Sequence, residues 1–178
     1  MATTTPSNAN PTPAKTVTTS TAGKGPDAVA LLKADHRAVE KLFAQFETAR
    51  DEDRKKALAD KICLDLRIHM TIEEEIFYPV SRDFLKNEDI VDEAVVEHAA
   101  ARDLMDEIEA MNAGEDLYDA KVKVLSEQIE HHVEEEEEEY FPKVQKTDMD
   151  LKDVGARMQA RKDELTAQMD TGQGKAVQ

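Results

Sequence analysis

The sequence predicts an all-α protein: an up-down-up-down antiparallel four-helix bundle with an extra C-terminal helix and a disordered N-terminal tail. Aromatic residues make up 4% of the 178 residues, Trp is absent, and Gly and Pro number six each. This composition disfavours β-sheets, which need aromatic residues and frequent turns. Apolar residues recur at helical steps of three and four over four long stretches. Short connections between these stretches favour antiparallel neighbours.

The chain divides into three parts. Residues 1–26 hold four of the six prolines, many threonines and no acidic residue, so we expect a disordered tail there. Residues 27–146 contain the four amphipathic stretches and form the predicted bundle. Residues 147–178 contain a fifth, weaker amphipathic stretch and a loose end.

Four helices are expected in the central part, over residues 27–47, 54–78, 89–111 and 117–141. Turns are expected between them at residues 50–53, 80–88 and 112–116. The fifth stretch contains Leu151, Val154, Met158, Leu165 and Met169, and Gly155 lowers its helix propensity. This helix either crosses the bundle or mediates a dimer, so the sequence allows a monomer or a dimer.

An internal repeat links the second and fourth helices. The segment HMTIEEEIFYP (69–79) matches HVEEEEEEYFP (132–142), with His, Glu, an aromatic pair and Pro in register. The pair Asp35-His36 of the first helix likewise matches Glu97-His98 of the third. The repeat predicts two helical hairpins of the same design that face each other.

Each predicted helix carries one histidine on its apolar side. The inward positions are His36, His69, His98 and His132, and Glu73 and Glu136 follow one turn after the second and fourth. Beyond Glu73 the apolar side is expected to continue through Ile76 and Val80. The midpoints between successive histidines fall inside the predicted turns, which places all four in one layer of the core.

This polar layer predicts a metal centre. Burying two carboxylates without partners would cost several kcal/mol each, and a bound metal offsets that cost. Imidazole and carboxylate ligands without a thiolate suit iron, manganese or zinc. Six ligands are too many for one tetrahedral zinc and fit a dinuclear centre.

These motifs resemble the hemerythrin family in its HHE cation-binding form, over roughly residues 27–146. The resemblance depends on Asp35-His36, His69-x-x-x-Glu73, Glu97-His98 and His132-x-x-x-Glu136, with the segments EEEIFYP and EEEYFP. It implies a four-helix bundle with two iron ions, bridged by carboxylate or oxo groups, with Mn or Zn as alternatives. The implied ligands of the iron are O2, NO or peroxide.

Two positions depart from the oxygen carriers of the family. These carriers have a second histidine four residues after the first on the third helix, where this chain has Arg102, and an aspartate where this chain has Glu137. Glu40 is a candidate replacement ligand, or a partner of Arg102. His131 is expected at the surface or behind the ligands, with His131–Glu135 as an alternative register. The departures argue against reversible O2 transport.

We therefore favour a di-iron protein that binds or senses O2, NO or the iron or redox state. The alternatives are a di-iron enzyme (an oxidase, a peroxidase or an NO-detoxifying protein) and an acidic helical scaffold without metal. The net charge of −16 argues against nucleic acid and anionic membranes. The single Cys63 excludes an internal disulfide, and we expect it to be an inert packed thiol. The chain shows no signal peptide or membrane span, so we expect a cytoplasmic location.

Overall fold

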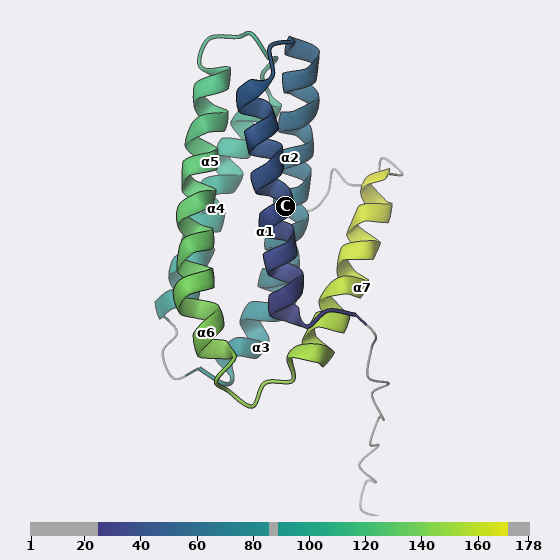
Figure 1. Ribbon diagram of the computed structural model, residues 1–178, viewed down its shortest axis with the longest axis vertical. Coiled ribbons are helices and arrows are strands. Elements are labelled where there is room, and N and C mark those ends of the chain that lie inside the picture. The colour runs from purple at the N-terminus through teal and green to yellow at the C-terminus, as the bar shows by residue number, and fades with distance from the viewer. Residues whose placement is uncertain (1–24, 86–88, 171–178) are drawn as a thin grey trace, which may run out of the picture.

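The computed structural model describes residues 25–85 and 89–170. Four long helices run antiparallel: α1 (Ala28–Thr48), α2 (Glu52–Ile72), α4 (Asp89–Glu109) and α5 (Tyr118–Glu135) (Figure 1). A fifth long helix, α7 (Leu151–Asp170), packs against α1 and α2 outside the bundle. The predicted helical bundle with an extra C-terminal helix is therefore confirmed. The expected tail lies outside the described residues except for Gly25 and Pro26, and so does the loose end after Asp170.

The first two helices begin at capping aspartates. The side chain of Asp27 accepts a hydrogen bond from the backbone N–H of Ala30 at 2.8 Å, and Asp51 accepts one from Arg54 at 2.8 Å. Each carboxylate satisfies an N–H group that has no partner within the helix, and its charge is favourable at a helix N-terminus. These caps fix where the first hairpin begins and turns.

A wide π-helical turn interrupts each half of the repeat, beginning at its ligand-type glutamate. These turns are η1 (Glu73–Phe77) and η2 (Glu136–Tyr140), and they continue into the short helices α3 (Tyr78–Arg82) and α6 (Phe141–Val144). Pro79 and Pro142 are the second residues of these short helices. A proline ring inside a helix clashes with the carbonyl four residues before it, and a wider turn accommodates it.

The π turn corrects one expectation about the second helix. Ile76 and Val80 are only partly buried, whereas Phe77 and Ser81 are fully buried. The wide turn adds a residue to the helical repeat, so the inward side advances by one position.

Two apolar clusters lie along the bundle with the polar layer between them. The first joins the start of α1, the end of α2, both aromatic pairs and α7, and includes Leu32, Ile72, Phe77, Phe141 and Met158. The second fills the far end and includes Phe43, Ile62, Met105, Leu125 and Cys63. Burial raises the pKa of the Cys63 thiol to about 12, so the thiol is unreactive at neutral pH.

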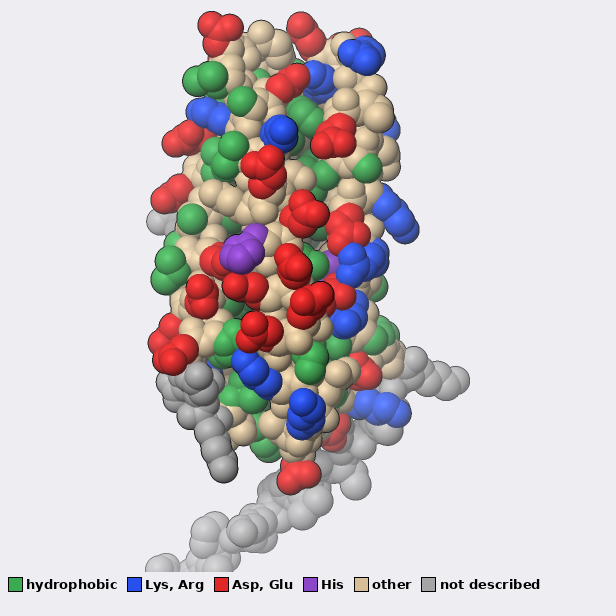
Figure 2. Space-filling view, turned by 60° about the vertical axis from the view of Figure 1, so that its left-hand side comes forward, with side chains coloured by type: hydrophobic (Ala, Val, Ile, Leu, Met, Phe, Trp, Pro, Cys, Tyr) green, Lys and Arg blue, Asp and Glu red, His purple; other side chains and the backbone are tan. Residues whose placement is uncertain are grey.

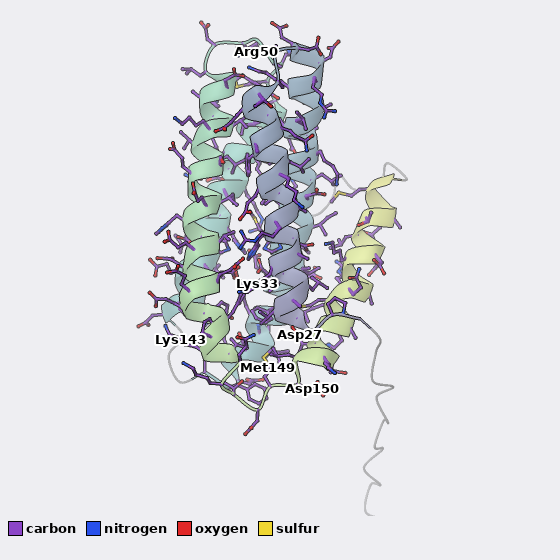
Figure 3. The ribbon with its side chains drawn as sticks, in the orientation of Figure 1. Asp27, Lys33, Arg50, Lys143, Met149 and Asp150 are labelled. Carbon is purple, nitrogen blue, oxygen red and sulfur yellow. The ribbon has the colours of Figure 1, made fainter. Side chains whose placement is uncertain are left out.

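Helix α7 approaches the start of α1 closely at Gly155. A Cβ atom at this position would lie 2.7 Å from the backbone nitrogen of Ala28 and 2.7 Å from the carbonyl oxygen of Pro26. Figure 3 shows Asp27 beside Met149 and Asp150, which precede α7. Val154, Met158 and Leu165 of α7 are buried in the first cluster. Gly155 therefore sets how closely α7 can pack, which its low helix propensity alone does not indicate.

None of the described helices is both long enough and apolar enough to cross a membrane.

Candidate metal centre

The structure brings the six principal candidates together in one buried layer. His36, His69, His98 and His132 come from α1, α2, α4 and α5, and Glu73 and Glu136 begin the two π turns. Each of the six is at most 6% exposed. Ligand atoms of His36, His69, Glu73 and Glu136 lie within 4.8 Å of one another, and so do those of Glu73, His98 and His132. The two groups share Glu73.

The histidines form two pairs whose Nε2 atoms converge. These atoms are 3.3 Å apart in the pair His36–His69 and 3.1 Å apart in the pair His98–His132. Glu73 Oε2 lies 3.2 Å from His69 Nε2 and 3.5 Å from His98 Nε2. Glu136 Oε2 lies 3.3 Å from His36 Nε2 and 3.7 Å from His132 Nε2. Each glutamate therefore touches one histidine of each pair and lies between the two half-sites.

A second ring of carboxylates faces the outer nitrogen of every imidazole. Three imidazoles donate a hydrogen bond from Nδ1–H to one of these carboxylates. The pairs are His36 with Glu137 at 2.9 Å, His98 with Glu74 at 2.9 Å and His132 with Glu97 at 2.7 Å. Asp35 lies 3.6 Å from His69 Nδ1, which is beyond hydrogen-bond distance. A hydrogen bond at Nδ1 fixes the tautomer that leaves the Nε2 lone pair free for a metal.

Cations hold these outer carboxylates in turn. Arg102 lies 2.8 Å from Glu74 and Lys162 pairs with Asp35. Glu137 lies 2.6 Å from Arg37 and 3.3 Å from Lys33, which extends from α1 toward η2 (Figure 3). Burial opposes ionisation of Asp35, Glu74 and Glu137, but the imidazoles and these cations together lower the pKa of each carboxyl. The ring therefore stays anionic and accepts hydrogen bonds from the imidazole N–H groups.

The three further candidates lie around this ring. Arg102 forms an ion pair with Glu74, which in turn accepts a hydrogen bond from His98. Glu40 is exposed and pairs with Arg37, so it lies outside the cluster and does not contact Arg102 as the sequence hypothesis proposed. His131 is exposed, 3.8 Å from Glu97 and 3.5 Å from Glu135, and this group adjoins the second ring through Glu97. Figure 2 shows acidic side chains crowded around an exposed histidine on this face.

The sequence does not single out Glu74 and Glu137 as the partners of His98 and His36. Each directly follows a buried glutamate, so its side chain points about 100° away from that of the glutamate and meets the histidine of the neighbouring helix. The signal was present in the repeat, because both copies have a second Glu at this position.

The residues fit a metal because the carboxylates lack other partners. Neither oxygen of Glu73 accepts a hydrogen bond from the described residues, and Glu136 Oε2 lacks one as well. Burial, with Glu136 beside it, holds the pKa of Glu73 well above its usual range. Burial also lowers the pKa of His69 to about 4. Burial therefore favours a protonated Glu73 when no cation is bound, and a metal would take the place of that proton.

One hydroxyl group also reaches the layer. The Tyr78 ring stacks on His98 with centroids 5.6 Å apart, and its hydroxyl donates to Glu136 Oε1 at 3.2 Å and lies 3.4 Å from His98 Nε2. In the other half of the repeat Phe141 stacks on His36. Both aromatic pairs also belong to the first apolar cluster. The order Phe-Tyr in one copy and Tyr-Phe in the other is the signal that distinguishes Tyr78.

Comparisons with known proteins agree with this arrangement. The family model described as the hemerythrin HHE cation binding domain matches residues 27–144. A DNA nickase from Nostoc sp. is 27% identical over 111 residues, which are 62% of this chain and 31% of that protein. An uncharacterised hemerythrin-like protein from Schizosaccharomyces pombe is 23% identical over 114 residues, 63% of this chain and 56% of that protein. The chain thus spans about a third and just over half of these two relatives.

A solved structure has the same fold. The crystal structure of a hemerythrin HHE cation binding domain-containing protein from Mycobacterium kansasii superposes with a TM-score of 0.70 at 24% identity. The match covers 85% of this chain and 96% of that chain.

Proposed function

Because this chain belongs to the hemerythrin HHE cation-binding domain family, we propose that it is a non-heme di-iron protein that binds or senses O2, NO or the iron or redox state. The observation that carries this proposal is the position of Glu73. This carboxylate is fully buried, accepts no hydrogen bond from the residues that the structure describes, and lies between two pairs of imidazole Nε2 atoms. A pair of bound cations would give Glu73 and Glu136 the partners that the protein does not provide.

Each half-site would be built from two imidazoles and shared carboxylates. His36 and His69 would hold one iron and His98 and His132 the other, with Glu73 and Glu136 available to both half-sites. When bound, the iron pair supplies redox chemistry and positions for a small ligand. The outer carboxylates keep the imidazoles oriented.

The donor set of four imidazoles and two carboxylates accepts manganese and zinc as well as iron. The geometry therefore does not select iron over manganese or zinc. The choice of iron depends on the family to which the chain belongs. The cytoplasmic location and the monomeric or dimeric state stay predictions.

A di-iron enzyme is the second candidate, and Tyr78 favours it. Reduction of a peroxide consumes protons, and the Tyr78 hydroxyl is a hydrogen-bond donor within the layer. We do not extend the name DNA nickase to this chain, because more than two thirds of that protein lies outside the match and the net charge of −16 opposes DNA binding.

The test is elemental analysis of anaerobically purified protein, followed by its visible spectrum when air is admitted. Bound iron with a reversible spectral change supports a binding or sensing protein. Steady consumption of peroxide or NO, lost in His69→Ala, supports the enzyme. Protein that holds no iron even after reconstitution overturns both and leaves the acidic scaffold.

A further inference from the structure

A pocket leads from helix α7 to the polar layer. It has a volume of about 260 Å³ and reaches all four buried histidines. Its walls come from α1, α2 and α5, and its apolar lining includes Val39, Leu66, Met70, Ile129 and Val133. Lys162 and Thr166 of α7 lie at its outer end together with Lys61 and Asp65. The pocket thus connects the metal layer with the edge of the bundle that α7 covers.

The pocket is larger than a diatomic gas requires. A water molecule, which is close to O2 in size, has a share of about 30 Å³ in the liquid. Small-molecule sites in proteins begin near ~300 Å³, and this pocket approaches that size. The part of this space at the histidines would hold the metal ions, and the apolar part beyond them is where a ligand larger than O2 or NO would lie.

The charges at the outer end are already paired. Lys162 forms an ion pair with Asp35, and Lys61 forms one with Asp65. Two cations and two anions leave this end without net charge, and a charged ligand would have to break one of these pairs. An uncharged molecule with an apolar body fits both the paired charges and the apolar walls.

We propose that this pocket binds a neutral organic molecule of about ten non-hydrogen atoms, with an apolar body and one hydroxyl or hydroperoxy group directed at the histidines. The proposal deepens the proposed function, because it names the class of molecule that the metal centre meets. Helix α7 covers the site, and Lys162 ties that cover to Asp35 beside His69.

The experiment measures binding of 2-phenyl-2-propanol, a neutral probe that is not a peroxide, by calorimetry and ligand-observed NMR. Phenylacetate, of similar size but charged, is the comparison probe. Both are titrated into full-length protein with metal and after chelation. We expect saturable binding of the alcohol in both forms, and at least tenfold weaker binding of phenylacetate.

Two variants locate the site. Ala38→Phe and Thr166→Phe place a ring at the pocket from α1 and from α7, and each should weaken alcohol binding at least about tenfold. Ala44→Phe is the matched control, because Ala44 is exposed on α1 away from the pocket lining. Circular dichroism and the thermal midpoint check that all three variants fold.

Lack of saturable binding, or equal binding by all variants, overturns the proposal. Equal affinity for phenylacetate overturns the claim that the pocket selects neutral ligands. Alcohol binding to protein that never holds iron would refute the proposed function and leave the pocket site intact. Protein that holds iron but does not bind the alcohol would refute the pocket site and leave the proposed function intact.

Discussion

The two half-sites share one plan and differ in their surroundings. Each has two imidazoles from a helical hairpin and a glutamate at the start of a π turn. In the second half-site Glu97 accepts a hydrogen bond from His132 at 2.7 Å, and its neighbour His131 is exposed. In the first, the corresponding Asp35 lies 3.6 Å from His69 and pairs with Lys162 of α7. The repeat thus preserves the inner donors, while α7 changes the setting of one half.

The difference extends to protonation of the metal-free protein. Burial lowers the pKa of His69 to about 4. Burial also opposes the charge on His132, but the carboxylates of Glu136 and Glu97 outweigh it and raise the pKa of His132. Equivalent positions in a repeat can therefore differ in chemistry when their outer partners differ.

The largest effect should come from the residue common to both halves. Glu73→Gln removes the carboxylate that touches His69 and His98, so we expect loss of most bound iron from both half-sites. The metal-free variant should be at least as stable as metal-free wild type, because an unpaired buried carboxyl group is removed. Iron per chain and thermal unfolding after chelation measure both effects. Glu40→Gln is the matched control, and equal iron content in the two variants would contradict the shared role.

The protonation difference predicts opposite pH profiles. Unfolded histidine has a pKa near 6.5, so between about pH 6.5 and about pH 4 the unfolded chain binds a proton that folded His69 does not. As the pH is lowered over that range, the contribution of His69 should reduce the free energy of unfolding by on the order of 1–3 kcal/mol. The raised pKa of His132 has the opposite sign, since its contribution is complete below about pH 6.5 and is lost as pH rises through the folded value.

Urea unfolding of metal-free protein at about pH 5 and about pH 7.5 measures these profiles. His69→Gln should reduce the loss of stability at the lower pH, whereas His132→Gln should cost most there. Identical changes in the two variants would show that the half-sites do not differ in this way.

Gly155→Ala should disturb the packing of α7 against α1, beside the first half-site. Helix propensity alone favours alanine by about 1 kcal/mol. The added Cβ would meet the α1 backbone at 2.7 Å, and such overpacking costs about 1–3 kcal/mol. We expect net destabilisation of about 1 kcal/mol or more, with weaker protection of α7 amides in hydrogen exchange. Ala156→Gly, at an exposed neighbour, should cost about 1 kcal/mol without affecting α1. A stabilised Gly155→Ala protein would refute the close contact.

The smallest change in stability should come from the inverted aromatic pair. Tyr78→Phe removes one buried hydrogen bond, worth about 1 kcal/mol, and Tyr140→Phe removes the bond to Ser81 at similar cost. Only Tyr78→Phe should slow peroxide consumption by iron-loaded protein, by about tenfold or more, because only its hydroxyl reaches Glu136. If both variants react alike, the inversion has no chemical role.

The sequence predicted the inner layer because it depends on local periodicity. Helical steps and the positions of the turns were enough to bring together the four histidines with Glu73 and Glu136. The shift after Glu73 was not predicted, since regular helical periodicity contains no signal for a π turn, although Pro79 and Pro142 indicated a disturbance. The contacts of Gly155 and Lys162 with α1 depend on tertiary packing, which periodicity does not describe.

The most direct test of the central claim is anaerobic titration of Fe(II) into chelated protein, followed by the thermal unfolding midpoint. If metal supplies the missing partners of Glu73 and Glu136, binding should saturate at two equivalents. The midpoint should rise by on the order of 10 °C or more. Metal binding adds several kcal/mol to the free energy of unfolding, and each kcal/mol raises the midpoint by ~2–4 °C. Binding that does not saturate, with an unchanged midpoint, would contradict the account.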